Sequence, residues 1–221
     1  MTHTHSIGNM LEIKDKNIKL EDKTTEDQTS KGTRTVFYGT LTYTPKGCMK
    51  CGVVNHSHAD IVKNGTKTST IKIGQYNFKL VVLKLKKQRF LCKHCGETFS
   101  AQTSLVDRHC FIANPLKSLI SLELREEQSM TLIAKHLNVS TSTVLRQLLK
   151  SGEHLKPNYR DLPQHLGIDE FKSVQGVSGA MSFLFIDNVT HQVLDIVENR
   201  QQSYLMNYFM RYSLQARRAV K

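Results

Sequence analysis

Two pairs of cysteine residues constrain the fold of this chain more than any other feature of its sequence. Each pair has the spacing Cys-x-x-Cys and is followed directly by a glycine, and the 40 residues 52–91 lie between the two pairs. Four thiolates in two tight pairs suit one tetrahedral Zn²⁺ ion, and the glycines let the backbone turn so that its amides face the sulfurs. The predicted zinc ligands are Cys48, Cys51, Cys92 and Cys95.

A redox-active dithiol or a set of disulfides would also place cysteines in such pairs. Two pairs, each followed by glycine, favour structural zinc. The β-rich segments 71–76, 78–85 and 88–91 between the pairs predict a zinc ribbon, in which hairpin strands join two metal-binding turns. The fifth cysteine, Cys110, has no partner at this spacing and is expected to be an inert, partly buried thiol.

Polar residues near the cysteines offer a second metal site as an alternative. His56, His58 and Asp60 follow the first pair in an H-x-H-x-D pattern, and His94 lies inside the second pair. Histidine and carboxylate side chains can bind metal ions. A polar loop is the favoured interpretation of the first group, and His94 is expected to take no part because four cysteines are already present.

Positive charge is concentrated around the predicted ribbon. The chain carries a formal net charge of +12, and residues 46–100 contain eleven Lys or Arg but two Asp or Glu. Such a patch is typical of a surface that binds a polyanion, most simply nucleic acid, although a solvated strand face would look similar. The residues predicted to contact DNA from this region are Lys84, Lys86, Lys87 and Arg89.

The N-terminal region gives weaker signals. Residues 23–32 are polar and are expected to form a loop, whereas residues 34–43 alternate enough to predict a strand leading to the first cysteine pair.

Helical periodicity begins at residue 114 and includes a predicted helix-turn-helix. A short amphipathic segment, 131–137, precedes a turn at 138–140 and a helix at 141–150, in which Val144 and Leu148 are expected to face inward. Short hydroxyl side chains at the start of the second helix can reach phosphates or base edges, and Arg146 can pair with guanine. An ordinary helical hairpin with a polar face is the alternative. The outward positions are Thr141, Ser142, Thr143, Arg146, Gln147 and Lys150.

The segment after residue 165 predicts three strands and a helix. Strands are expected over 166–171, 181–186 and 192–197 and a helix over 201–212, an order typical of an RNase H-like fold and of other α+β domains. Asp169 and Glu170 are adjacent in the first strand, so their side chains point to opposite faces and do not both bind one metal ion.

Taken together, these features resemble the ISL-three family of bacterial insertion-sequence transposases. The resemblance rests on residues 14–18, on 43–52 and 89–99 around the cysteines, on the helix-turn-helix, and on Gly167-Ile168-Asp169-Glu170 and Asn199-Arg200. It implies an RNase H-like nuclease core with an acidic triad, of which Asp169 would be the first member. The other two acids come from elements expected after residue 221. The resemblance therefore implies an incomplete catalytic set, which would bind Mg²⁺ only if it were completed.

The sequence thus predicts a multi-domain α+β chain. Residues 1–112 would form the N-terminal segment and zinc ribbon, 113–160 the helix-turn-helix domain, and 161–221 an incomplete RNase H-like β-β-β-α segment. The predicted function is transposition, with the chain binding double-stranded DNA at the terminal inverted repeats of its element but not cutting alone.

Two alternatives belong to other classes of protein. One is a non-catalytic zinc-dependent DNA-binding regulator that competes with the full-length transposase, and a weaker one is an RNA- or translation-associated zinc ribbon. A homo-oligomer is compatible with any of these functions. The chain has no run of 18 apolar residues that would cross a membrane, and its cysteine usage fits the reducing cytoplasm.

Overall fold

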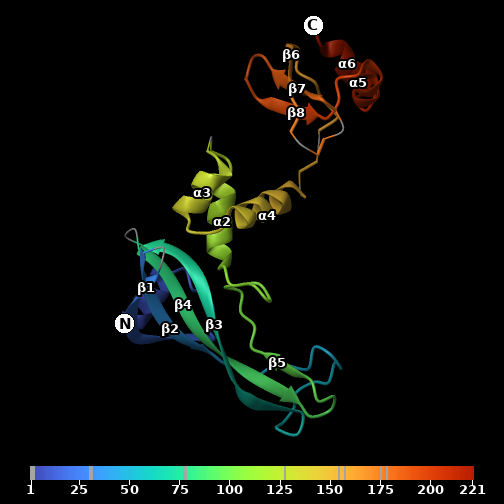
Figure 1. Cartoon of the computed structure of the whole chain (residues 1–221). Coiled ribbons are helices and arrows are strands. Elements are labelled where there is room, and N and C mark those ends of the chain that lie inside the picture. The colour runs from blue at the N-terminus through green and yellow to red at the C-terminus, as the bar shows by residue number, and fades with distance from the viewer. Residues whose placement is uncertain are drawn as a thin grey trace. The chain divides into compact units, whose positions relative to one another are not determined.

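The computed structural model describes residues 3–29, 32–76, 79–126, 128–153, 155–156, 158–174, 176–177 and 179–221 (Figure 1). Within these residues the chain is a mixed α/β protein with two sheets and six helices. It divides into two compact units, Met1–Glu153 and His154–Lys221, each with its own sheet. The first unit contains both the region predicted as a zinc ribbon and the region predicted as a helix-turn-helix.

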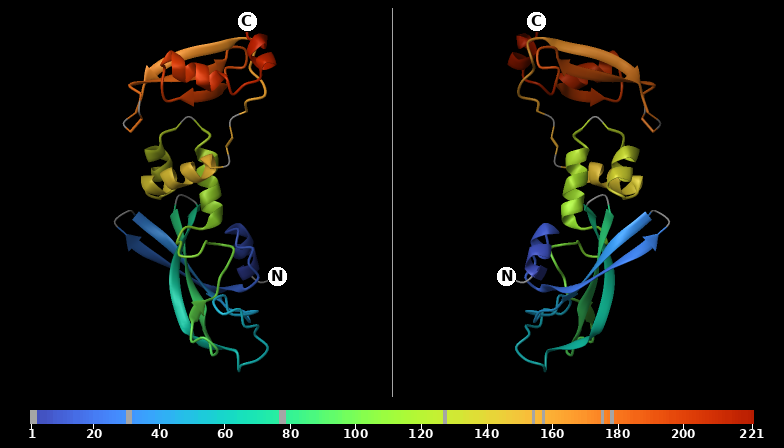
Figure 2. Two further views of the ribbon diagram at one scale, coloured as in Figure 1. Left: turned by 90° about the vertical axis from the view of Figure 1, so that its right-hand side faces the viewer. Right: turned by 90° about the vertical axis from the view of Figure 1, so that its left-hand side faces the viewer.

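Two antiparallel hairpins joined side by side form the sheet of the first unit (Figure 2). One hairpin pairs β1 with β2 and the other pairs β3 with β4, and parallel pairing of β2 with β4 joins them, while β5 adds to β4. The strands are β1 (Ile18–Thr29), β2 (Gly32–Leu41), β3 (Ile61–Tyr76), β4 (Lys79–Cys92) and β5 (Thr98–Ser100).

Two sequence predictions for this sheet need correction. The loop expected over 23–32 is wrong, because β1 continues to Thr29. This strand lies at the edge of the sheet and is mostly exposed, so it lacks the apolar alternation by which strands are recognised. The separate strands expected over 71–76, 78–85 and 88–91 are parts of one long hairpin, and Phe78 lies outside the described residues.

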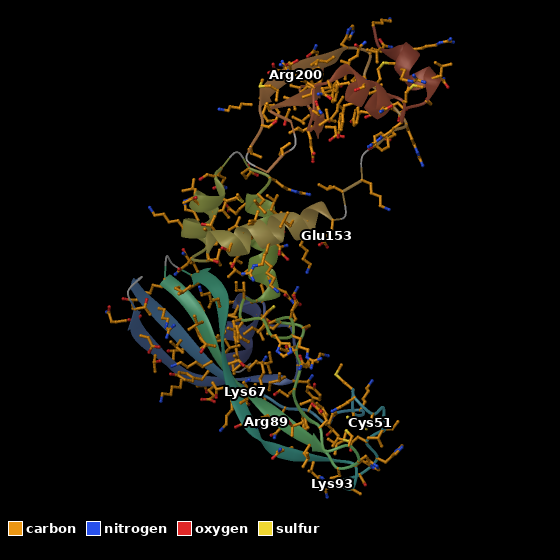
Figure 3. All side chains as sticks on the ribbon, turned by 45° about the vertical axis from the view of Figure 1, so that its right-hand side comes forward. Cys51, Lys67, Arg89, Lys93, Glu153 and Arg200 are labelled. Atoms are coloured by element: carbon orange, nitrogen blue, oxygen red, sulfur yellow. The ribbon has the colours of Figure 1, made fainter. Side chains whose placement is uncertain are left out.

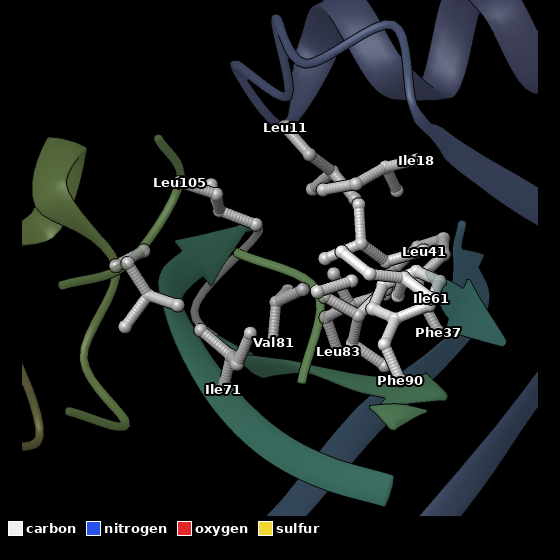
Figure 4. Close-up of a cluster of buried hydrophobic side chains, with 14 of the residues drawn as sticks. Leu11, Ile18, Phe37, Leu41, Ile61, Ile71, Val81, Leu83, Phe90 and Leu105 are labelled. Atoms are coloured by element: carbon white, nitrogen blue, oxygen red, sulfur yellow. The ribbon is translucent and has the colours of Figure 1, made fainter. Parts of the chain in front are cut away.

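A hydrophobic core lies against one face of this sheet (Figure 4). Leu83 and Leu85 of β4 are fully buried there, together with Leu41 of β2 and Ile71 of β3. Helix α1 (His3–Met10) contributes Ile7 at the edge of this core, and the segment after β5 contributes Leu105. Val81, Leu83 and Leu85 are two residues apart along β4 and therefore share this face, because successive side chains of a strand face opposite sides.

Three short helices form a second core within the first unit. They are α2 (Asn114–Glu123), α3 (Met130–His136) and α4 (Thr141–Gly152). Ser129 and Ser140 cap the second and third by accepting hydrogen bonds from backbone N–H groups three residues later. The shared core consists of Leu116, Ile120, Ile133, Ala134, Leu137, Val139 and Val144.

The helices expected from the sequence in this region are confirmed, with one difference in packing. Leu148 was expected to face inward, but it is 41% exposed. Helix α4 instead turns Gln147 and Ser151 toward α2, where both contact the hydroxyl of Ser121. Polar side chains thus occupy part of the α2–α4 interface beside the buried Val144.

The helices are fixed to the sheet at Lys72 of β3. Its ammonium group donates a hydrogen bond to the carbonyl of Asn138, in the turn between α3 and α4, over 3.0 Å. Its backbone also exchanges hydrogen bonds with Phe111 and Ala113, just before α2. Asn138 adopts a φ of 50°, which lets the turn between the two helices stay short.

The second unit packs two helices against a three-stranded antiparallel sheet of order β6-β7-β8. Phe185 of β7 stacks on Tyr208 at 5.3 Å between ring centroids, and Tyr212 and Tyr159 complete the aromatic core. The strands and the first helix were predicted; the second helix was not. The elements are β6 (Leu166–Lys172), β7 (Met181–Asp187), β8 (Val193–Val197), α5 (Gln202–Phe209) and α6 (Leu214–Ala219).

Truncation of Leu83 tests the position of the first core. Leu83→Ala is expected to lower the free energy of unfolding of the first unit by about 2–5 kcal/mol, because it leaves a cavity in a fully buried site. Hydrogen exchange of the β3 and β4 amides measures this unit separately from the second. The matched control is Leu149→Ala on α4, where the side chain is exposed and the change should stay within about 0.5 kcal/mol. Equal exchange rates in the two variants would contradict the assigned core.

Candidate metal centre and nucleic-acid interface

The four paired cysteines meet at one end of the β3–β4 hairpin. Cys92 is the last residue of β4, and its thiol lies 3.7 Å from that of Cys51; the thiols of Cys48 and Cys95 are also 3.7 Å apart. All four sulfurs lie within 4.8 Å of one another. Tetrahedral coordination with metal–sulfur bonds of about 2.3 Å would place the sulfurs about 3.8 Å apart. The cluster therefore has the size and donor set of a site that can bind a metal ion, and structural zinc fits it.

The two metal-binding turns have the same backbone structure. In each turn the N–H of the first cysteine and the N–H of the glycine form hydrogen bonds that close the loop. The glycines have φ values of 74° at Gly52 and 69° at Gly96, a region that favours glycine. The bonds are all 2.9 Å long and join Cys48 N to Val53 O, Gly52 N to Cys48 O, Cys92 N to Glu97 O and Gly96 N to Cys92 O.

The pKa values of two of the four thiols are shifted in opposite directions. Backbone N–H groups of Cys51 and Lys50 lower the pKa of Cys48 to about 6. The N–H of Glu97 acts in the same direction on Cys95, but burial and the three neighbouring thiols outweigh it and raise the pKa of Cys95 to about 12. Four thiolate charges in this small volume would need a cation to balance them.

Polar contacts outside the thiols also join the two turns. Lys50 donates to the carboxylate of Glu97 over 2.6 Å, and His94 hydrogen-bonds Asp60 through Nε2 over 2.9 Å. Asp60 also accepts from the backbone N–H groups of His56 and Ser57, and the contact with His94 is the main cause of its lowered pKa.

The region 56–60 is thus a polar loop, as expected. The four-cysteine cluster is the single group of three or more metal-ligating side chains found in the described ranges. His94 forms a hydrogen bond with Asp60. The sequence did not indicate this contact, because the two residues are 34 positions apart.

The four basic residues predicted on β4, of which Figure 3 labels Arg89, lie on both faces of the strand. Alternation places Lys84 and Lys86 on one face and Lys87 and Arg89 on the other. Lys84 lies 3.7 Å from the carboxylate of Asp27 and over the ring of Tyr38, so its charge is partly neutralised. Burial, together with repulsion from a neighbouring lysine, lowers the pKa of Lys87. Lys86 is exposed, and Arg89 lies 3.4 Å from the hydroxyl of Thr98.

Helix α4 exposes most of the residues predicted to contact DNA. Thr141, Ser142, Arg146 and Lys150 are exposed, and Thr143 is half-buried. The guanidinium of Arg146 donates to the carbonyl of Ser142 and to the hydroxyl of Thr143, each over 3.2 Å, so it lies over the first turn of the helix.

One of the outward positions predicted on α4 is wrong. Gln147 donates to Ser121 of α2 over 2.8 Å and faces the helix interface. Two leucines on the exposed side of α4 were not identified from the sequence as surface residues. Leu145 is 42% exposed and Leu149 is 62% exposed, although a hydrophobic pattern would favour burying both.

Asp169 lies exposed on β6. Its carboxylate accepts a hydrogen bond from the N–H of Glu170, and Glu170 in turn pairs with Arg200 over 2.8 Å. Asp195 of β8 binds the hydroxyl of Tyr208, on the side of the sheet covered by α5.

The strand register keeps these acids apart. Asp169 pairs with Leu184 and Asp195 with Phe185, and adjacent β7 residues face opposite sides, so the two acids do too. Asp187 ends β7, and its carboxylate accepts hydrogen bonds from the N–H of Val189 and the hydroxyl of Thr190 in the turn that follows. Asp169 thus belongs to no group of three acidic or histidine ligands in the part of the chain described.

No family model matches the chain, and neither a curated protein nor a solved structure shows significant similarity to it. Among the described residues, no helix is both long and apolar enough to cross a membrane.

Replacement of one buried cysteine tests the metal centre. Cys92→Ser is expected to abolish zinc binding and to unfold the end of the β3–β4 hairpin, because metal-binding energy contributes directly to the folding of such small modules. The measurement is zinc content per chain after dialysis, together with hydrogen exchange of residues 85–92. Cys110→Ser is the matched control, since this partly buried thiol lies outside the cluster. Full zinc content and unchanged exchange in Cys92→Ser would rule out the assignment.

Proposed function

We propose that this chain binds double-stranded DNA through α4, as the end-binding part of an insertion-sequence transposase of the ISL-three type. The observation that carries the proposal is the α3–turn–α4 pair, in which Ser140 caps a helix whose first turns expose Thr141, Ser142 and Arg146. A helix of this kind fits the major groove of B-form DNA, with its N-terminal residues at the base edges.

The side chains of α4 suit this role. Hydroxyls near the helix N-terminus can donate to phosphates, and the backbone N–H groups there favour an anion. The guanidinium of Arg146 lies over the same turn, from which it can pair with guanine O6 and N7. Helix α4 contains no acidic residue that would repel the phosphates.

In this proposal the sheet contributes positive charge that attracts DNA, and it contributes little to the recognition of a particular DNA sequence. Lys86 and Lys67 are exposed on the β3–β4 hairpin, and a formal charge of +12 favours a polyanionic partner. The pairing of Lys84 with Asp27 reduces what the predicted patch can contribute. We therefore assign sequence recognition to α4 and long-range attraction to the hairpin. A zinc ion at the four cysteines would hold the end of the hairpin together.

The second unit supports the transposase interpretation through its order of three antiparallel strands followed by a helix. In the proposal Asp169 corresponds to the first acid of the family's triad. A two-metal nuclease needs carboxylates converging from several elements, and the described residues bring none to Asp169 in a group of three. The isolated position of Asp169 favours a second candidate function, a non-catalytic regulator that occupies the same DNA ends.

Substitution of Arg146 tests the proposal. The DNA site is first selected from a random duplex pool and compared with the inverted repeats flanking the gene. Arg146→Ala is expected to weaken binding to this site by about 1–3 kcal/mol and to relax the preference at one base pair, because a bidentate contact with guanine is lost. Affinity for the site and its single-base variants, measured at fixed salt, gives the result.

The control is Lys16→Ala, which removes the same charge from an exposed position far from α4 in the sequence. It should lower affinity slightly and equally for all sequences. If Arg146→Ala did the same, α4 would not be the recognition helix. Failure of the intact, zinc-loaded chain to select any duplex would refute the proposed function.

Replacement of Asp169 separates the two candidate functions. Asp169→Asn is expected to leave DNA binding unchanged, since the side chain lies in the other compact unit from α4. In cells carrying the marked element, an unchanged transposition frequency would support the regulator, and loss of transposition would support the transposase.

A further inference from the structure

An apolar side chain occupies the exposed face of α4 between its polar groups. Leu145 is 42% exposed and lies outside the core that α2, α3 and α4 share. Ser142 precedes Leu145 by three residues, so these two side chains are neighbours on the helix surface, and Arg146 follows Ser142 by four residues on the other side of it. A large apolar side chain is thus left partly in solvent at this position.

The direction of helical side chains places Leu145 near the start of α4. Side chains in a helix point back toward its N-terminus, so Leu145 covers the turn that contains Thr141 and Ser142. The guanidinium of Arg146 is drawn over the same turn by its bonds to Ser142 and Thr143. Leu149, one turn later, lies farther from the helix N-terminus.

The surroundings of Leu145 favour nucleic acid over an apolar protein partner. Helix α4 has no acidic residue, and Arg146 and Lys150 share its exposed side. A protein surface that covered Leu145 would also bury these charges, at a cost in desolvation unless carboxylates matched them. In the major groove the charges meet phosphates and base edges, and the apolar group available there is the C5-methyl of thymine.

We propose that Leu145 is a specificity-determining residue that contacts the C5-methyl group of a thymine beside the base pair bound by Arg146. The inference rests on the proposed function and adds to it the chemical identity of a second base. Leu145 thereby selects thymine over cytosine, which has no methyl group at this position, while Arg146 selects guanine.

Replacement of thymine by deoxyuridine tests this contact, because it removes only the methyl group. Each thymine of the selected duplex is replaced in turn, and the affinity of the zinc-loaded full chain is measured. At one position the replacement is expected to weaken binding about fourfold, the factor that follows from losing one buried methyl group. Leu145→Ala should bind the thymine and deoxyuridine duplexes equally at that position.

Two further variants make the result specific. Leu145→Met keeps an apolar side chain of similar reach and should retain the preference for thymine. Leu149→Ala removes the neighbouring exposed leucine and should also retain it. Zinc content and circular dichroism of each variant verify that it is folded.

The outcomes separate this inference from the proposed function. If the intact chain bound its site but no deoxyuridine replacement had an effect, the contact with a methyl group would be wrong and the DNA-binding function would stand. A thymine preference that persisted in Leu145→Ala would assign the methyl contact to another residue. Absence of sequence-selective DNA binding would overturn both proposals.

Discussion

Strand β4 is the element on which the first unit depends. It pairs with β2 on one side and β3 on the other, and β5 adds to its end. Its buried side chains, among them Leu83 and Leu85, form the middle of the core, and its last residue is the ligand candidate Cys92. One strand therefore carries both the hydrophobic packing in its middle and a ligand candidate of the four-cysteine cluster at its end.

The three small helices rely on this sheet for their position. Their own core is small and contains few large side chains, and the ammonium of Lys72 ties the α3–α4 turn to β3. Short helices of this length are marginal without such packing. The side of α4 that faces the other helices carries both the buried Val144 and Gln147, which bonds Ser121. The surface proposed to meet DNA is thus set by contacts on the opposite side of the helix.

The sequence was most informative where local chemistry decides the structure. The four cysteines and the turn at 138–140 before α4 could be predicted, because spacing or side-chain type specifies each one within a few residues. Contacts between residues far apart in the chain could not be predicted from such local patterns. No local pattern distinguishes a polar edge strand such as β1 from a loop. The hydrogen bond of His94 with Asp60 and that of Gln147 with Ser121 depend on partners far apart in the chain. Counting charges along the sequence likewise indicated a basic region. It did not indicate that Asp27, from another strand, pairs with Lys84 of that region.

The two similar turns around the cysteines have a consequence for how the first unit assembles. All four sulfurs come from residues 48–95, and the nearly adjacent strands β3 and β4 bring the two turns together without β1 or β2. The parallel pairing of β2 with β4 joins residues 34–41 to 80–87, a similar separation in the sequence, and adds no ligand to the cluster. Capture of the ion and completion of the sheet are therefore separable events, and the metal content of a preparation reports on the hairpin rather than on the whole unit.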